Sequence, residues 1–192
     1  MEKKKILVID DEEILTRTFV KLLERNGYDV LQLTKENEII PFLESFFKQH
    51  MERRSLTSNP SSFAKKEVKD FYLNLSRHFS EPGGVIFTVI KSQGEPIAFH
   101  FGFAYNKKFL WYKPSFDVRL AKHSPGEVLL KELLEYAYSH HYEEFDFSIG
   151  EEPFKKRFAN IVRKNLSFKI FKSSGPYYLN RMVTAFKKIK NL

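Results

Sequence analysis

Three apolar segments between residues 85 and 114 constrain the fold most, because only three to five mostly polar residues separate each from the next. Connections this short join antiparallel strands, whereas parallel strands need a crossover of a dozen residues or more. The sequence therefore predicts an antiparallel meander at the centre of a sheet. Its strands are Val85–Ile90, Pro96–Ala104 and Lys108–Pro114, connected through Ser92–Glu95 and Tyr105–Lys107.

Amphipathic helices are predicted before and after this meander in the sequence. Thr34 is the expected N-cap of a first helix, whose apolar positions recur at helical spacing. A loop rich in Ser, Asn and Pro is expected over Arg53–Phe63, followed by a helix from Ala64 to Phe79. Pro125 opens a leucine-rich helix that runs to His140.

Shorter elements complete the predicted order. A strand is expected at Asp29–Leu33, before the first helix. With it, the order is β-α-α-β-β-β-α-β-α-β followed by a helix, which predicts an α/β fold with a mixed sheet. The remaining elements are a strand Glu144–Phe147, a helix Pro153–Asn160, a strand Leu166–Phe171 and a basic helix Tyr177–Ile189.

Composition excludes several classes of protein. Without cysteine, the chain has no disulfide, no thiolate metal site and no cysteine nucleophile. There is no cluster of His, Asp and Glu with metal-ligand spacing, so no metal site is predicted. The longest apolar stretches are Ile6–Ile9 and Val85–Ile90, far below the ~20 residues of a membrane span. With no signal peptide visible, we expect a soluble, cytoplasmic protein.

The formal net charge of +8 is concentrated near the C-terminus. Such a field favours polyanionic partners, such as a nucleotide cofactor, tRNA or an anionic membrane surface. The alternative is a solvated face that only keeps the protein soluble. The basic residues of the last 40 positions are Lys155, Lys156, Arg157, Arg163, Lys164, Lys169, Lys172, Arg181, Lys187, Lys188 and Lys190.

The N-terminal segment Lys3–Val30, KKKILVIDDEEILTRTFVKLLERNGYDV, resembles the start of a bacterial response-regulator receiver domain. Its Asp10 and Asp11 resemble the magnesium-binding acidic pair of receivers. The helical residues that follow contain no aspartate to accept a phosphate, so helix capping is the preferred interpretation of this pair. We interpret residues 1–34 as a truncated receiver-like β-α-β segment whose last strand is shared with the next domain.

A second resemblance covers residues 36–160, about two-thirds of the chain. An aspartate past a strand, SPG before a leucine-rich helix, and D-x-x-x-G-x-x-x-[YF]-K-x-x-[FW] form a long ordered pattern. It resembles the acetyltransferase-like domain of CelD-type proteins, which are related to the Fem aminoacyltransferases and share the GNAT fold. The segments that carry it are FLESFFKQHMERR (42–54), GEPIAFHFGF (94–103), YKPSFDVRLAKHSPGEVLLKELLEYA (112–137) and FDFSIGEEPFKKRFA (145–159).

This resemblance implies a GNAT-like mixed sheet with antiparallel central strands and flanking helices, extended by the β-α unit of the receiver-like segment. The GNAT-like domain then spans residues 35–175, and a basic amphipathic helix spans 176–192. The implied activity is transfer of an acyl group from acetyl-CoA or another acyl-CoA to an amine or other acceptor, in cell-envelope or polysaccharide metabolism. Direct attack on the thioester needs no cysteine intermediate, which agrees with the composition.

The turn before the leucine-rich helix is the expected donor site. Helix N-termini hold phosphates through free N–H groups, and glycine lets the backbone approach closely. In GNAT enzymes the equivalent turn cradles the pyrophosphate of coenzyme A. Ser124, Pro125 and Gly126 would form this cradle, with Lys122 and His123 adding positive charge. An ordinary Ser-Pro helix start is the alternative.

Four residues are candidates for catalysis. Asp117 occupies the family's motif position, as a base or substrate anchor, or else as a capping residue. Asp146 lies in an apolar strand and must be paired or hydrogen-bonded, and Lys155 is its candidate partner or a contact of the donor. His100 on the meander suits general-base work or a simple hydrogen bond.

Two other functions stay open. The first is transfer from aminoacyl-tRNA, as in the Fem relatives, supported by the basic C-terminal region. The second is a non-catalytic signalling or binding module with a receiver remnant that cannot be phosphorylated. The sequence does not define the acceptor, which includes small amines, lipids, polysaccharides and peptidoglycan precursors.

Overall fold

A computed structural model describes residues 28–80, 83–166, 168, 170–173, 175, 177 and 178 of the chain. It divides the chain into two units, of which the first ends at Phe158 and the second begins at Ala159. All the helices and strands given below belong to the first unit. Asp10, Asp11, the rest of the receiver-like segment up to residue 27, and most of the expected C-terminal helix lie outside the described residues.

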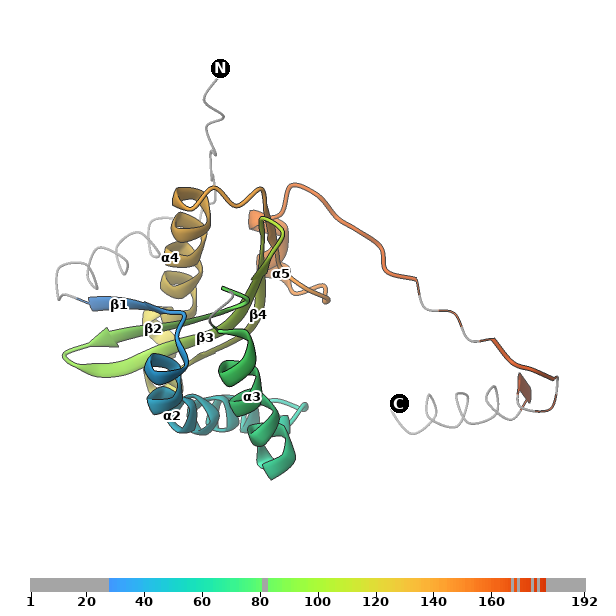
Figure 1. Cartoon of the computed structure of the whole chain (residues 1–192), viewed down its shortest axis with the longest axis horizontal. Coiled ribbons are helices and arrows are strands. Elements are labelled where there is room, and N and C mark those ends of the chain that lie inside the picture. Colours follow the sequence, from blue (N-terminus) through green and yellow to red (C-terminus); the bar gives the residue numbers. More distant parts are fainter. Residues whose placement is uncertain are drawn as a thin grey trace, which may run out of the picture. The chain divides into compact units, whose positions relative to one another are not determined.

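The sheet has five strands in the order β1-β2-β3-β4-β5 (Figure 1). The pairs β1–β2, β2–β3 and β3–β4 are antiparallel, and β5 pairs with β4 in parallel. The predicted meander and the mixed sheet are therefore confirmed. The strands are β1 (Tyr28–Leu33), β2 (Val85–Ser92), β3 (Glu95–Tyr105), β4 (Lys108–Phe116) and β5 (Glu144–Asp146).

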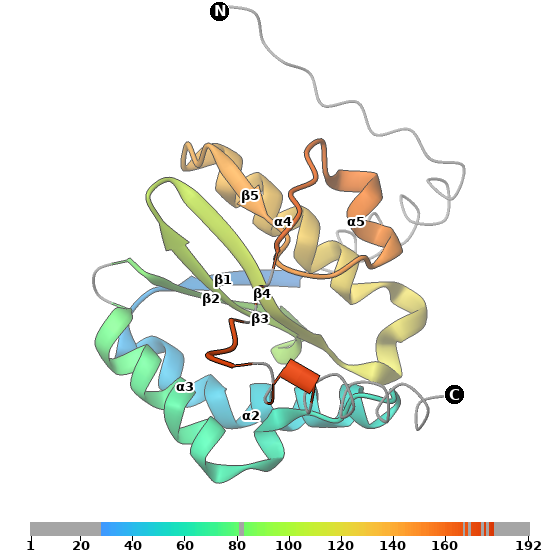
Figure 2. The same ribbon diagram turned by 90° about the vertical axis from the view of Figure 1, so that its right-hand side faces the viewer.

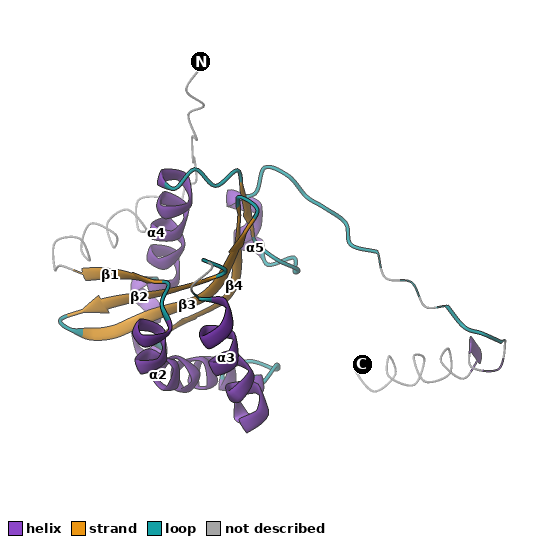
Figure 3. Ribbon diagram, in the orientation of Figure 1, coloured by secondary structure: helices purple, strands orange, loops and turns teal. Residues whose placement is uncertain are grey.

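Helices cover both faces of the sheet (Figures 2 and 3). The helices α2 (Glu36–Ser55) and α3 (Lys66–Phe79) lie on one face. The helices α4 (Pro125–Ser139) and α5 (Pro153–Phe158) lie on the other. Two 3₁₀ helices, η1 (Ser62–Ala64) and η2 (Val118–His123), connect α2 to α3 and β4 to α4.

Each face of the sheet has its own apolar core. The strands β2 and β3 alternate their side chains between the two faces, so consecutive residues enter different cores. Phe46 of α2 is fully buried against Phe87 and Phe101 of the sheet. On the opposite face, Leu129 and Leu133 of α4 are equally buried. The near-continuous burial of β2 and β3 follows from this double coverage.

The structure corrects two boundaries of the first helix. Lys35, and not Thr34, is the N-cap, because its carbonyl accepts the first helical hydrogen bonds from Glu38 and Ile39 at 3.1 and 3.0 Å. The helix also continues to Ser55, into the predicted loop. Arg53 and Arg54 lie in its last turn, where cations interact favourably with the helix dipole.

The strand predicted at Leu166–Phe171 is not present among the described residues of that range, which have no regular secondary structure. Alternation alone does not make a strand, because the backbone groups need a neighbouring strand as partner. In the part of the chain that the structure describes, no helix is long and apolar enough to span a bilayer.

Candidate functional site

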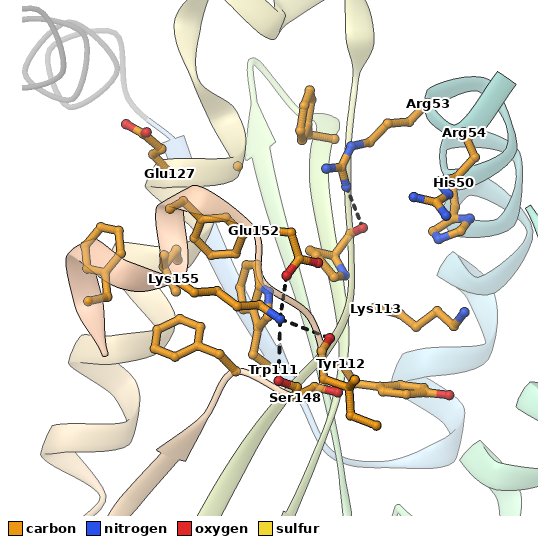
Figure 4. Close-up of a pocket in the computed structure, with 18 of the residues that line it drawn as sticks. His50, Arg53, Arg54, Trp111, Tyr112, Lys113, Glu127, Ser148, Glu152 and Lys155 are labelled. Carbon is orange, nitrogen blue, oxygen red and sulfur yellow. Dashed lines mark hydrogen bonds and ion pairs between the residues drawn. The ribbon is translucent and has the colours of Figure 1, made fainter. Parts of the chain in front are cut away.

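A cavity of about 620 Å³ opens where β4 and β5 separate (Figure 4). The two strands pair over only three positions, from Lys108 with Glu144 to Leu110 with Asp146. Beyond Leu110, β4 continues to Phe116 beside β3 alone. The cavity walls come from α2, β4, the start of α4, the loop after β5, and α5.

A β-bulge at the start of this opening explains why β4 leaves β5. Phe101 of β3 pairs with Lys113 and Phe103 pairs with Leu110, so Trp111 and Tyr112 both lie opposite Gly102. Bulges bend the strand that carries the extra residue and increase its local twist. The bulge therefore directs the second half of β4 away from β5.

His100 stabilises the bulge through a hydrogen bond and ring contacts. Its Nε2 accepts a hydrogen bond from the backbone N–H of Tyr112 at 3.2 Å. The ring stacks on Trp111 and Phe109, with centroids 4.9 and 5.7 Å away. A Cβ on Gly102 would collide with this imidazole, so glycine is required there. Of the two roles expected for His100, the structure shows the simple hydrogen bond. The side chain does not line the cavity.

Burial lowers the pKa of His100 to about 3, so its ring is neutral at physiological pH. Since Nε2 is the acceptor, the remaining proton is assigned to Nδ1. Among the residues that the structure describes, Nδ1 has no hydrogen-bond partner. This histidine is a structural group of the sheet.

The predicted donor turn lies partly in the cavity wall. Ser124 and Gly126 line the cavity together with Ala121, whereas Lys122, His123 and Pro125 do not. Ser124 has a left-handed backbone with φ of 49°. A Cβ on Gly126 would lie 3.1 Å from the Phe116 ring, so a side chain there would press against the cavity wall.

Lys155 lines the cavity, but it does not pair with Asp146 as predicted. Its Nζ forms an ion pair with Glu152 at 2.8 Å and donates to the carbonyl of Ile149 at 3.1 Å. The Asp146 carboxylate instead accepts from the backbone N–H of Ser148 at 2.7 Å, outside the cavity wall. Both residues therefore shape the loop after β5, and Lys155 is the one that faces the cavity.

Asp117 lies beside a different hollow, against α2. It caps η2 by accepting from the backbone N–H of Arg119 at 2.9 Å, and it pairs with that guanidinium at 2.6 Å. The hydrogen bond with Arg119 lowers the pKa of the Asp117 carboxyl, against the opposing effect of burial. The structure therefore brings Lys155, Ser124 and Gly126 together and leaves Asp117 and Asp146 apart from them.

Sequence reasoning missed the basic wall of the cavity. His50, Arg53 and Arg54 project from α2, and Lys113 projects from β4. Burial, followed by the charges of Lys113, Arg54 and Arg53, lowers the pKa of His50 to about 4. His50 also bonds Ser61 Oγ at 2.8 Å. The spacing i, i+3, i+4 within HMERR was the available signal, because it places three basic side chains on one helix face.

Two carboxylates on the opposite wall were also missed, and both are paired. Glu127 bonds Arg157 at 2.8 Å, and Glu152 bonds Lys155. Burial acts to raise the pKa of Glu152, but the hydrogen bond with Lys155 and the positive charge bring it below its usual value. Glu152 is therefore ionised at neutral pH and points toward Lys155 in the cavity (Figure 4).

Solved structures share this fold. A possible acetyltransferase from Clostridium difficile 630 is similar at a TM-score of 0.56 and 6% identity, over 75% of this chain and 98% of that one. The ribosomal-protein-alanine N-acetyltransferase from Brucella melitensis biovar Abortus 2308 has a TM-score of 0.52 and 10% identity, over 76% and 99%. An integron cassette protein from the mobile metagenome of V. cholerae has a TM-score of 0.51 and 15% identity, over 80% and 97%.

A search of curated proteins found no significant sequence match. The model of the acetyltransferase (GNAT) domain family matches residues 14–156. This range contains the whole described sheet, the helices on both faces and most of the cavity wall. The chain therefore belongs to the GNAT acetyltransferase family.

Proposed function

We propose that this protein transfers an acetyl group from acetyl-CoA to an amine acceptor bound in the cavity between β4 and β5. The separation of these strands beyond Leu110 carries the proposal, because it opens the sheet beside a helix N-terminus. A donor and an acceptor can then meet from opposite sides of one sheet edge. Holding two reactants in line is the main source of rate in such a reaction.

The start of α4 is the proposed site for the donor phosphates. Pro125 has no N–H, and the amide of Glu127 is already bonded to Ser124 O at 2.9 Å, so Gly126 supplies the accessible backbone there. Lys122 and His123 precede this turn outside the cavity wall, and the Lys122 ammonium adds positive charge near the donor phosphates. Helix N-termini favour anions through both their free amides and the dipole.

The transfer forms a C–N bond and breaks the C–S bond of the thioester. Beyond Leu110 the outer edge of β4 has no strand partner among the described residues, so its backbone N–H groups can polarise the thioester carbonyl. We assign Glu152 as acceptor of the amine proton, since it is ionised and faces the cavity. Lys155 orients Glu152, and the departing thiolate takes up a proton from solvent.

Asp117 and Asp146 have positioning roles in this proposal. Asp117 orders η2, which leads into the donor turn, and Asp146 orders the loop that carries Ser148 and Ile149. Neither carboxylate lines the cavity. Replacing either one should therefore change the affinity for acetyl-CoA more than the rate of the chemical step.

Calorimetric titration with acetyl-CoA and with free coenzyme A tests the donor site. We expect saturable binding to the wild type and loss of binding in Gly126→Trp, because an indole at this position would occupy the cavity. Glu135→Trp is the matched control, since this exposed position lies on the same helix outside the cavity wall. Absence of binding to the well-folded wild type would refute the proposal.

Transfer from aminoacyl-tRNA, in a Fem-like role at the cell envelope, is the second candidate. The basic residues near the C-terminus support it, because Lys and Arg contacts dominate binding to nucleic acid. Binding of charged tRNA that weakens steeply with salt, together with no affinity for acetyl-CoA, would favour it. A non-catalytic binding module would bind neither donor.

We also propose that the receiver-like segment extends the sheet. The family match begins at residue 14, inside that segment, and β1 lies at the end of the segment. Trimming residues 1–27 should then lower the melting temperature of the protein. Unchanged melting and solubility of the trimmed chain would rule out a structural role.

A further inference from the structure

We propose that the acceptor of this enzyme carries an anionic group, a carboxylate or a phosphate, which is held by the basic wall of the cavity. We define the basic wall as His50, Arg53, Arg54 and Lys113. This inference rests on the proposed acetyl transfer and assigns the acceptor's chemical class. It predicts discrimination between acceptors by charge.

The basic wall is built from two segments that are distant in sequence. Arg53 is fixed by a hydrogen bond from Nη1 to the carbonyl of Pro114 at 2.9 Å and by stacking over Phe116, with 4.4 Å from Cζ to the ring centroid. Lys113 lies over the rings of Phe63 and Tyr112, at 5.6 and 5.5 Å. These contacts hold both cations in place before any ligand binds.

The cations of the basic wall have no carboxylate partner among the described residues. Elsewhere in the first unit, many basic side chains are paired, such as Lys69 with Glu44 at 2.9 Å and Arg157 with Glu127 at 2.8 Å. Arg53, Arg54 and Lys113 are half-buried, so water screens their charges less than it screens those of exposed lysines. Half-buried, unpaired cations in a cavity wall form a site for an anion.

The charges facing His50 agree with this interpretation. The lowered pKa of its imidazole shows that burial and three neighbouring cations disfavour another positive charge there. A cationic acceptor group would meet the same repulsion. The carboxylates of the cavity, Glu127 and Glu152, lie across from the basic wall and are already paired (Figure 4).

Within the basic wall, Arg53 adjoins the start of α4 through the Phe116 ring, which packs beside Gly126, and the other three members lie across the cavity from it. In Figure 4, Glu127 of the first turn of α4 lies on one side of the cavity, and His50, Arg54 and Lys113 lie on the other. A donor whose phosphates rest on the start of α4 leaves this second side to the acceptor. An acceptor anion held here would place its amine toward Glu152.

Fluorescence of Trp111 provides a direct readout, because it is the single tryptophan of the chain and it lines the cavity. The protein is saturated with coenzyme A and titrated with matched pairs of amines. These are β-alanine against β-alaninamide, and O-phosphoethanolamine against ethanolamine. Spermidine serves as the polycationic probe.

We expect saturable binding of at least one anionic probe, and weaker binding of its uncharged-carbonyl or alcohol analogue. Arg54→Gln and Lys113→Gln should each raise the dissociation constant of that anion about tenfold or more, as expected for loss of a charge-assisted hydrogen bond. Lys48→Gln is the control, since Lys48 is an exposed cation on the same helix outside this cavity. Comparing O-phosphoethanolamine with β-alanine shows whether the anion is a phosphate or a carboxylate.

Three results would overturn the inference. They are tighter binding of spermidine than of either anion, no saturable binding of either anion, or loss of affinity for coenzyme A instead of the anion in both variants. The last result would assign the basic wall to the donor. Failure of coenzyme A to bind the wild type would instead refute the proposed function, so the two failures are distinguishable.

Discussion

His100 and Gly102 act as one unit in the sheet. They lie two residues apart on β3, on the same face, and the imidazole fills the space that a side chain at Gly102 would need. The ring also satisfies the backbone N–H of Tyr112, which the bulge would otherwise leave unpaired. The shape of the cavity entrance therefore depends on a histidine that never reaches the cavity.

Gly102→Ala should destabilise the protein by about 1–3 kcal/mol, because its methyl group would overlap the His100 ring. In a His100→Ala background the same substitution should leave the free energy of unfolding almost unchanged, since the ring is absent. The free energies of unfolding from urea denaturation of the four proteins of this cycle give the coupling. Equal costs of Gly102→Ala in both backgrounds would contradict the assigned contact.

Two buried histidines should make stability depend on pH. The pKa values of His50 and His100 are lowered from 6.5 to about 4 and about 3, so below pH 6.5 the unfolded chain binds protons that the folded chain does not. Their contribution is complete above pH 6.5 and falls by about 1.4 kcal/mol per pH unit for each histidine as the pH decreases toward 4.

Urea denaturation at pH 7, 6 and 5 measures this slope. His50→Gln should make the slope shallower, because only one of the two histidines with a lowered pKa then remains. A slope in His50→Gln identical to that of the wild type would show that His50 titrates normally in the folded protein.

At the scale of elements, α2 connects the core to the cavity. Its buried face carries Phe46, which contacts Phe63, Phe87 and Phe99 with ring centroids 5.3, 5.6 and 6.0 Å away. The last turn of the same helix carries Arg53 and Arg54 of the basic wall. The packing of the middle of α2 therefore determines where the charges of its last turn lie.

Phe46→Ala should lower the free energy of unfolding by about 3–5 kcal/mol, because it leaves a cavity among well-packed rings. Phe71→Ala on α3 is the matched control, since 56% of the Phe71 surface is exposed. Chemical denaturation of both variants checks the difference. Similar losses in the two proteins would contradict the described packing of α2.

At the scale of the whole molecule, the first unit contains the complete described sheet, both cores and every residue of the cavity wall. The basic residues from Arg163 onward belong to the second unit. Acetyl-CoA binding and any binding of polyanions by the C-terminal region should therefore be separable.

A chain that ends at Phe158 should bind acetyl-CoA with an affinity within about twofold of the full chain, while salt-dependent tRNA binding should fall sharply, because phosphate contacts add with each Lys or Arg. Circular dichroism of the shortened chain provides the control for folding. Loss of acetyl-CoA affinity in a well-folded shortened chain would show that residues after 158 belong to the donor site.

Much of the fold follows from local sequence patterns. The short polar connections at 92–95 and 105–107 allow only antiparallel neighbours, and the apolar spacing before and after them predicts the helices. The SPG turn predicted the start of α4, with Pro125 as its first residue. Strand Leu166–Phe171 was predicted from the same kind of pattern and is not present, since pairing depends on a neighbour.

Spatial neighbours decided the candidate site, and no local pattern encodes them. Lys113 and Arg54 are 59 positions apart, and they meet only because α2 packs against β4. Asp117 and Asp146 fit the motif, but hydrogen bonds with Arg119 and Ser148 hold them outside the cavity. Local patterns along the chain define the elements and the family motif, because these depend on residues close in sequence. Which charges share a cavity follows from the packing of helices and strands, because packing brings together residues that are far apart in sequence.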